Sequence, residues 1–228
     1  MLASSAASLW VAEGLVLMAE QLAVARLGPG AESSRDAAVD PVDVMRARHW
    51  SLLATLLFRP PGQELLEQLS SLEADETPLG AARGMLAASA REANEAALAR
   101  EFHDLFIGLG RGELLPYASY YLTGFLHEKP LAKVRADMER LGLARADGVG
   151  EPEDHIATLA EIMAGLLSGA FEAGAEEAPR FFARHIAPWA GTFFRDLETA
   201  EHARFYRAVG RLGRVFVEIE AEAATLPA

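Results

Sequence analysis

Apolar side chains recur every three to four residues along most of the chain, which is the spacing of a buried face on an α-helix. The pattern is clearest in residues 201–223, close to the C-terminal end of the sequence. Its apolar positions are Phe205, Val209, Leu212, Phe216 and Ile219. This regular stripe predicts a long amphipathic helix, and we expect it to be the most buried helix of the protein.

Residues that favour helix starts separate the other periodic segments. Asp40-Pro41, Thr77-Pro78 and Asn94 each combine a capping side chain or a first-turn proline with an apolar run behind it. The pattern predicts helices over about 41–59, 62–73, 78–90, 94–108, 131–142 and 151–167, with others starting near Ser119, Pro179 and Pro188. Residues 108–118 and 142–150 are predicted loops.

Residues 1–40 have a different character. Residues 9–25 are apolar but contain Glu13, Glu20 and Gln21, and residues 28–40 are rich in Gly, Ser and charge. We therefore predict an N-terminal helical arm and linker over 1–40, followed by one domain over 41–228. The apolar stretch lacks the basic start of a secretory signal and the uninterrupted length of a membrane span. A cytoplasmic protein without stable membrane insertion is expected.

Composition supports the helical interpretation. Ala and Leu account for 44 and 32 of the 228 residues, whereas Val, Ile and Thr together number only 23. Ala and Leu suit helices, and β-branched residues suit strands. We predict an all-α fold, a compact single-domain bundle of about nine to ten helices.

Charge and cysteine content exclude several functions. The net charge is −12, with only two lysines, which argues against nucleic-acid binding. The absence of cysteine excludes disulfides, thiolate metal sites and cysteine nucleophiles. The six histidines have neither the zincin nor the di-iron spacing, so no metal site and no cofactor is predicted.

The glycines of residues 108–112 resemble part of a phosphate-binding loop. Gly108, Gly110 and Gly112 follow a predicted helix rather than a strand, however, and no Gly-Lys-Ser/Thr sequence follows them. A helix C-cap followed by a flexible turn explains them. Contact with a nucleotide or another ligand stays an alternative, because glycines let backbone amides approach closely.

Two other segments carry candidate chemistry. Residues 151–155 (EPEDH) look like the first turn of a helix, where carboxylates complement the helix dipole, with His155 beside the apolar stripe and neutral. Three of the four tyrosines, Tyr117, Tyr120 and Tyr121, lie around Ser119, just after the 108–118 loop. Tyrosines of this kind occur both in cores and at recognition surfaces.

Together these segments resemble the TorD/DmsD/NarJ-like molybdoenzyme maturation chaperones, in order along most of the chain from about residue 45. The matching segments are residues 48–60 (RHWSLLATLLFRP), 101–108 (EFHDLFIG), 116–122 (PYASYYL), 151–156 (EPEDHI) and 181–189 (FFARHIAPW). Residues 1–40 have no counterpart in the resemblance.

The resemblance implies a cytoplasmic protein without catalysis of its own. Members bind the twin-arginine signal peptide, and often the body, of a molybdopterin-dependent oxidoreductase, and delay its export until the cofactor is inserted. An acidic protein suits a ligand that carries adjacent arginines and an apolar run.

From this resemblance we expect the 151–155 turn and the 108–121 loop to form one side of a peptide groove. Glu151 and Asp154 would meet the arginines, and His155 would fix the loop. Tyr117, Tyr121 and Trp189 would line the apolar part, and Ser119, between the two tyrosines, is a further candidate binding residue. Trp189 and Phe182 are also expected to pack in the core.

Two other functions remain open at this point. One is a helical binding protein or enzyme for a small molecule, such as a nucleotide or pterin, which includes direct contact with the molybdopterin cofactor. The other is a transcription regulator, which would need a basic face that residues 1–60 lack. The partner oxidoreductase and the choice between monomer and homodimer are not fixed by the sequence.

Overall fold

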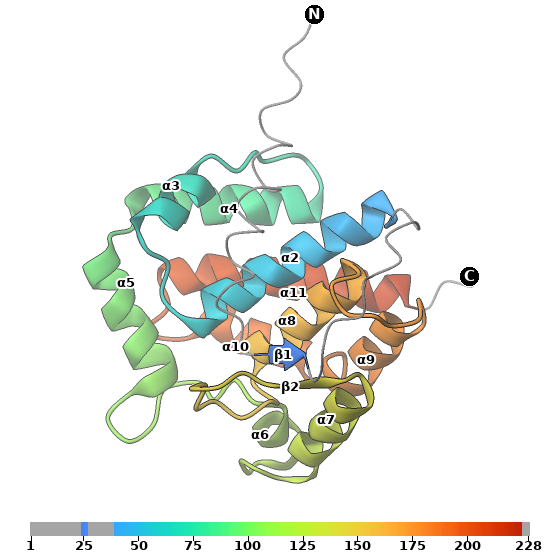
Figure 1. Ribbon diagram of the computed structural model, residues 1–228. Helices are drawn as coiled ribbons and strands as arrows, with labels where there is room; N and C mark the ends of the chain where they lie inside the picture. Colours follow the sequence, from blue (N-terminus) through green and yellow to red (C-terminus); the bar gives the residue numbers. More distant parts are fainter. Residues whose placement is uncertain (1–23, 27–38, 225–228) are drawn as a thin grey trace, which may run out of the picture.

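The structure is a computed structural model that describes residues 24–26 and 39–224. This part of the chain holds ten α-helices, one π-helix and two short strands (Figure 1). The elements are β1 (Val24–Arg26), α2 (Pro41–Phe58), α3 (Gln63–Ser70), α4 (Pro78–Glu92), α5 (Glu95–Phe102), η2 (His103–Ile107), α6 (Ala118–Thr123), α7 (Lys129–Arg140), β2 (Leu143–Arg145), α8 (Ile156–Leu167), α9 (Glu177–His185), α10 (Ala190–Thr199) and α11 (Phe205–Ala223). The predicted all-α fold is confirmed.

The centre of the molecule is made by α2, α8 and α11. α2 packs along α8, while α11 packs against α10, α4 and α2. Their core is aromatic: the Trp50 ring lies 5.0 Å from Phe216 and 6.0 Å from Phe182. Ten of the twelve residues of α8 are buried, so α8, and not the predicted C-terminal helix, is buried on almost every side.

The end of α11 departs from the predicted stripe. Ile219 is exposed, and the neighbouring Glu220 is buried instead. The Glu220 carboxylate accepts hydrogen bonds from Arg46 Nε at 2.8 Å and from Trp50 Nε1 at 3.1 Å, both on α2. These partners turn the Glu220 side of α11 inward and leave Ile219 outside.

The prediction for the N-terminal arm was wrong at its described end. Val24–Arg26, the end of the expected helix, forms a strand that pairs antiparallel with Leu143–Arg145. The Val24 amide also donates to Glu161 on α8 at 3.1 Å. These partners are more than 115 residues away in the sequence, so the local pattern does not reveal the strand. The rest of the predicted arm and linker lies outside the described residues, except 39–40.

The same pairing changes the predicted loop at 142–150, because its first residues are strand β2. Two helix starts also differ from expectation. α8 begins at Ile156 rather than near Glu151. α10 begins at Ala190, so Pro188 lies before the N-cap, Trp189, and not in the first turn of the helix. Pro179 lies in the first turn of α9, as predicted.

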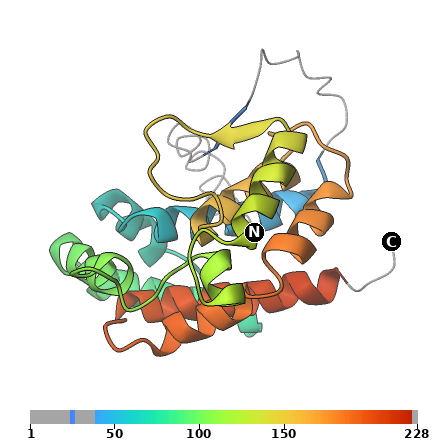
Figure 2. The same cartoon turned by 90° about the horizontal axis from the view of Figure 1, so that it is seen from below.

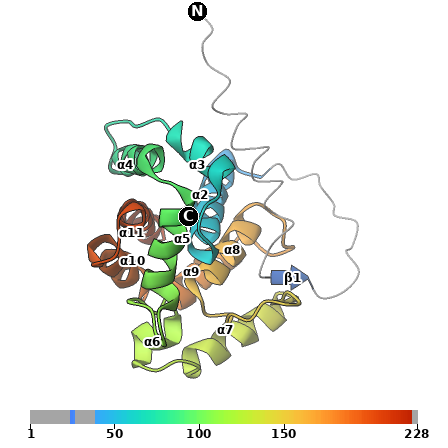
Figure 3. The ribbon, with the colours of Figure 1, turned by 90° about the vertical axis from the view of Figure 1, so that its left-hand side faces the viewer.

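α6 and α7 lie together at one end of the molecule, opposite α3 and α4 (Figures 1 and 3). In the view from that end, the light-green α6 is drawn above the orange-red α10 and α11, and the yellow-green α7 rises beside it (Figure 2). The segments predicted to form the functional site reach this end of the molecule. Among the described helices, none has the length and apolar character needed to cross a bilayer.

Candidate functional site where the starts of α6 and α8 meet

The first residues of α6 and α8 are joined by backbone hydrogen bonds. The amide of Ile156 donates to the carbonyl of Pro116 at 2.9 Å, and the amide of Ala118 donates to the carbonyl of Asp154 at 3.0 Å. Tyr117 and His155 therefore face each other in an isolated antiparallel bridge. The two segments that the sequence singled out thus form one junction.

Asp154 lies inside this junction. Its side chain is fully buried, and Oδ2 accepts from the Ser119 amide at 2.8 Å, which caps the first turn of α6. Oδ1 and the Ser119 hydroxyl are also buried, and neither has a hydrogen-bond partner among the described residues. In this structure the Asp154 carboxylate is not presented to a ligand, which differs from the direct arginine contact predicted for it.

His155 is the N-cap of α8. Its Nδ1 accepts from the Ala157 amide at 3.1 Å, so this nitrogen carries no proton. Burial lowers the pKa of His155 to about 4, and the charge of Glu151 opposes this only in part. The predicted neutral imidazole follows from this geometry, but the predicted helical turn over 151–154 does not exist.

Glu151 and Tyr117 form the exposed part of the junction. The Tyr117 hydroxyl donates to Glu151 Oε2, and the Tyr117 ring packs edge-on against His155 at 5.1 Å. Burial and the bond to Glu151 raise the pKa of Tyr117, so its hydroxyl remains a donor at neutral pH. Glu151 is exposed and is therefore available to a partner from outside.

Tyr121 and Trp189 form a second group, on the side of α10. The Tyr121 ring lies 5.3 Å from Trp189, and its hydroxyl donates to Asp196 at 3.0 Å. Trp189 is only 2% exposed, and its Nε1 donates to the His185 carbonyl at 2.7 Å. Phe182 is equally buried. Trp189 and Phe182 are core residues here, and Tyr121 joins them to α6.

The glycines of the 108–112 loop are explained by the path of the backbone. Gly108 has a φ of 61°, and a Cβ there would lie 2.1 Å from the Arg111 carbonyl oxygen. A Cβ on Gly112 would lie 2.6 Å from the Leu105 carbonyl oxygen, whereas Gly110 faces open space. The loop folds back on η2 and contacts α6 through Arg111, whose Nη2 donates to the Tyr120 hydroxyl at 3.2 Å. The prediction that these glycines contact a nucleotide or pterin stays a prediction.

Three carboxylates have roles that the sequence reasoning did not assign. Glu101 accepts from the amides of Arg204, Phe205 and Tyr206, which caps α11 from 105 residues away. Glu113 accepts from Glu201 and His202. The third is Glu153, which pairs with Arg135 of α7. Glu101 belongs to the motif at 101–108, but only the folded chain brings it to α11.

No group of three or more His, Asp or Glu side chains in the described regions is arranged to hold a metal ion. The arrangement at the junction instead combines an exposed carboxylate, a phenol and a rigid buried support. Such a surface can bind a cationic group.

The model of the nitrate reductase delta subunit family matches residues 72–195, which include η2, the α6–α8 junction and Trp189. The chain belongs to this family.

Curated relatives of the chain support the assignment, and a solved structure shares its fold. The chain is 27% identical to the chaperone protein TorD of Shewanella loihica, over 80% of this chain and 94% of that protein. It is 30% identical to TorD of Vibrio cholerae, over 53% of this chain and 59% of that protein. A redox enzyme maturation protein from Archaeoglobus fulgidus has the same fold, with a TM-score of 0.50 at 19% identity, over 82% of this chain and 99% of that one.

These findings confirm the resemblance to the TorD/NarJ-like molybdoenzyme maturation chaperones. The family is one of chaperones and not of enzymes.

Proposed function

We propose that this protein is a cytoplasmic chaperone that binds the twin-arginine signal peptide, the apo form, or both, of a molybdopterin-dependent oxidoreductase catalytic subunit. It would assist cofactor insertion and delay export. The observation that carries the proposal is the exposed carboxylate of Glu151, held by Tyr117 on a junction that buried Asp154 and His155 make rigid. A rigid carboxylate favours a planar guanidinium, which it can bind through two parallel hydrogen bonds.

Surface chemistry around the junction suits the apolar part of such a peptide. Leu122, Phe125 and Leu126, at the end of α6 and in the turn after it, are 43%, 70% and 39% exposed. These side chains follow Tyr117 closely in the chain, so the exposed apolar positions lie on the same segment as the tyrosine that holds Glu151. Exposed apolar clusters next to polar groups are typical of protein interaction sites.

Within this proposal the roles of the predicted residues are divided. Glu151 and Tyr117 contact the peptide, and Tyr121 supports the apolar surface. The starts of α6 and α8 are positioned by Asp154, Ser119 and His155. Trp189, at the start of α10, packs against Tyr121. The proposal therefore expects a direct effect on binding from Glu151 and an indirect one from Asp154.

Isothermal titration calorimetry with the full-length protein tests the peptide contact. One synthetic peptide carries two adjacent arginines before an alanine–leucine run, and a matched peptide carries two lysines. We expect the Glu151→Gln substitution to weaken binding of the arginine peptide by about 1 kcal/mol, roughly fivefold, because an exposed charged contact is lost.

Glu92, an exposed acid on α4, provides the control, since α4 lies at the opposite end of the molecule (Figure 1). Glu92→Gln should leave the affinity unchanged. Equal binding of both peptides by the unaltered protein, or no binding of either, would contradict the peptide proposal. Copurification of a molybdoenzyme with the protein from its native host, lost when the twin-arginine segment is deleted, tests the wider role.

A further inference from the structure

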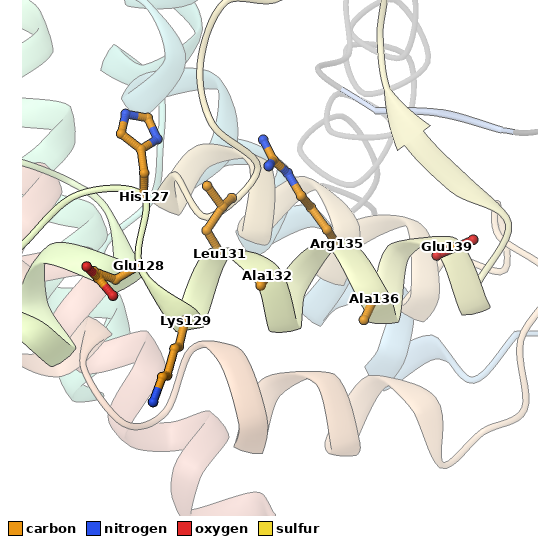
Figure 4. Close-up of a pocket in the computed structure, with 8 residues that line it drawn as sticks. All are labelled: His127, Glu128, Lys129, Leu131, Ala132, Arg135, Ala136 and Glu139. Atoms are coloured by element: carbon orange, nitrogen blue, oxygen red, sulfur yellow. The ribbon is translucent and has the colours of Figure 1, made fainter.

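A groove runs along one face of α7, next to the candidate site. It has a volume of about 490 Å³ and is lined by His127, Glu128, Lys129, Leu131, Ala132, Arg135, Ala136 and Glu139. His127, Leu131 and Arg135 point to the same side of the helix, and Lys129 points to the other (Figure 4). The groove thus presents the guanidinium of Arg135 to solvent.

Arg135 is held by an acid of the 151–155 turn. Its Nε and Nη2 both lie 2.8 Å from Glu153 Oε2. The two partners differ in exposure: the Arg135 side chain is 54% exposed, whereas that of Glu153 is 11% exposed. The carboxylate is therefore fixed in the protein, and the guanidinium is the partner that can leave.

The 151–155 turn has one other carboxylate that faces outward. Glu151 is exposed and accepts from the Tyr117 hydroxyl, whereas Asp154 is fully buried. Arg135 also has a second carboxylate to turn to, since Glu139 lies four residues along α7 in the same groove. The free-energy cost of breaking the Arg135–Glu153 pair would therefore be small, because Arg135 can pair with Glu139 instead.

We propose that Glu153 is a guanidinium-binding position of the peptide site and that Arg135 is its internal competitor. An arginine of the partner would take over the bond to Glu153, and Arg135 would turn into the α7 groove. This inference rests on the proposed function and assigns a specificity role within it. To displace Arg135, a ligand must offer a group that hydrogen-bonds the Glu153 carboxylate at least as well as Arg135 does. A guanidinium meets this requirement, and an ammonium group meets it less well.

The affinity of the twin-arginine peptide, measured by calorimetry on the full-length protein, tests the competition. Arg135→Gln should bind the peptide about two- to tenfold more tightly, because no internal pair has to be broken first. The gain should disappear in the Arg135→Gln/Glu153→Gln double variant. Lys133→Gln, which removes an exposed charge from the same helix, is the matched control and should give a smaller gain.

A second measurement does not depend on the peptide. Removal of Arg135 leaves a largely buried carboxylate without its partner, so the melting temperature of Arg135→Gln should fall. Arginine amide in the millimolar range should restore it more than lysine amide does, and neither should do so in the double variant.

The outcomes separate the two proposals. Unchanged or weaker peptide binding by Arg135→Gln, a gain equal to that of Lys133→Gln, or a gain that persists without Glu153 would overturn the competition. Absence of peptide binding by the unaltered protein, together with selective rescue by arginine amide, would remove the signal peptide as ligand and keep Glu153 as a guanidinium position. Absence of selective rescue in that case would overturn both.

Discussion

His155 combines two roles in one imidazole, as the N-cap of α8 and as a ring packed against Tyr117. Both roles require the neutral form, since Nδ1 is an acceptor. Its lowered pKa means that the unfolded chain binds a proton more readily than the folded one between about pH 6.5 and pH 4. The contribution of neutral His155 to the free energy of unfolding is thus present above pH 6.5 and is lost as the pH falls from about 6.5 to about 4.

We expect urea unfolding experiments to show this loss, of about 3 kcal/mol between pH 7 and pH 4 for this one group. His155→Asn keeps a side-chain acceptor for the N-cap but does not titrate. The difference in unfolding free energy between the two proteins should therefore depend on pH. A pH-independent difference would show that His155 is not buried in its neutral form.

Trp189 is the second residue whose role is testable alone. Because it is buried beside Tyr121 and Phe193, Trp189→Ala should destabilise the protein by about 3–5 kcal/mol in thermal or urea unfolding. A stable Trp189→Ala variant with lost peptide affinity would instead place this indole in the binding surface.

The sequence placed Asp154, His155 and Tyr117 together because the motif resemblance linked the two segments, and the structure brings these residues into one junction. It did not indicate which carboxylate faces outward. Exposure of Glu151 and burial of Asp154 depend on the pairing of residues 116–118 with 154–156, which no local pattern reports.

At the scale of elements, some helix starts have a local side-chain cap and others have a remote one. Asp40, Thr77 and Asn94 accept from amides two or three residues ahead, and all three starts were predicted within a residue or two. α11 begins at Phe205 instead of near residue 201, because its cap is Glu101. Local caps can be predicted from spacing, whereas remote caps require the fold.

The remote cap gives the element-scale prediction. Glu101→Ala removes the acceptor of three amides at the start of α11 and should lower the free energy of unfolding by about 1–3 kcal/mol. Hydrogen exchange at those amides should accelerate more than elsewhere. Arg100→Ala, at the exposed neighbouring position, serves as the control, and an equal loss in it would contradict the capping role.

At the scale of the whole molecule, β1 attaches a segment from outside the helical body to β2 and α8. Val24→Pro removes the amide that donates to buried Glu161 and should destabilise the protein by about 1–3 kcal/mol in urea unfolding. Val24→Ala shortens the side chain but keeps the amide. If both variants lose the same stability, packing of the side chain rather than this hydrogen bond holds the strand.

The overall architecture was predictable because apolar periodicity and Ala/Leu content act locally, helix by helix. The two-stranded pairing and the backbone hydrogen bonds between the starts of α6 and α8 were not, since each joins segments that are far apart in the sequence. The family resemblance supplied the order of the segments, but the charges that face each other across α7 and the 151–155 turn appear only in the structure.

The Glu101 cap on α11 has a consequence for how the chain is made. During synthesis, α5 leaves the ribosome about a hundred residues before residues 204–206, whose amides donate to Glu101. Ser119 likewise emerges 35 residues before Asp154, which accepts from its amide. The start of α6 therefore lacks its acceptor until Asp154 has been made, and Glu101 lacks these donors until residues 204–206 have been made. A nascent chain that stalls before residue 204 would therefore lack α11 and leave the Glu101 carboxylate without these three donors.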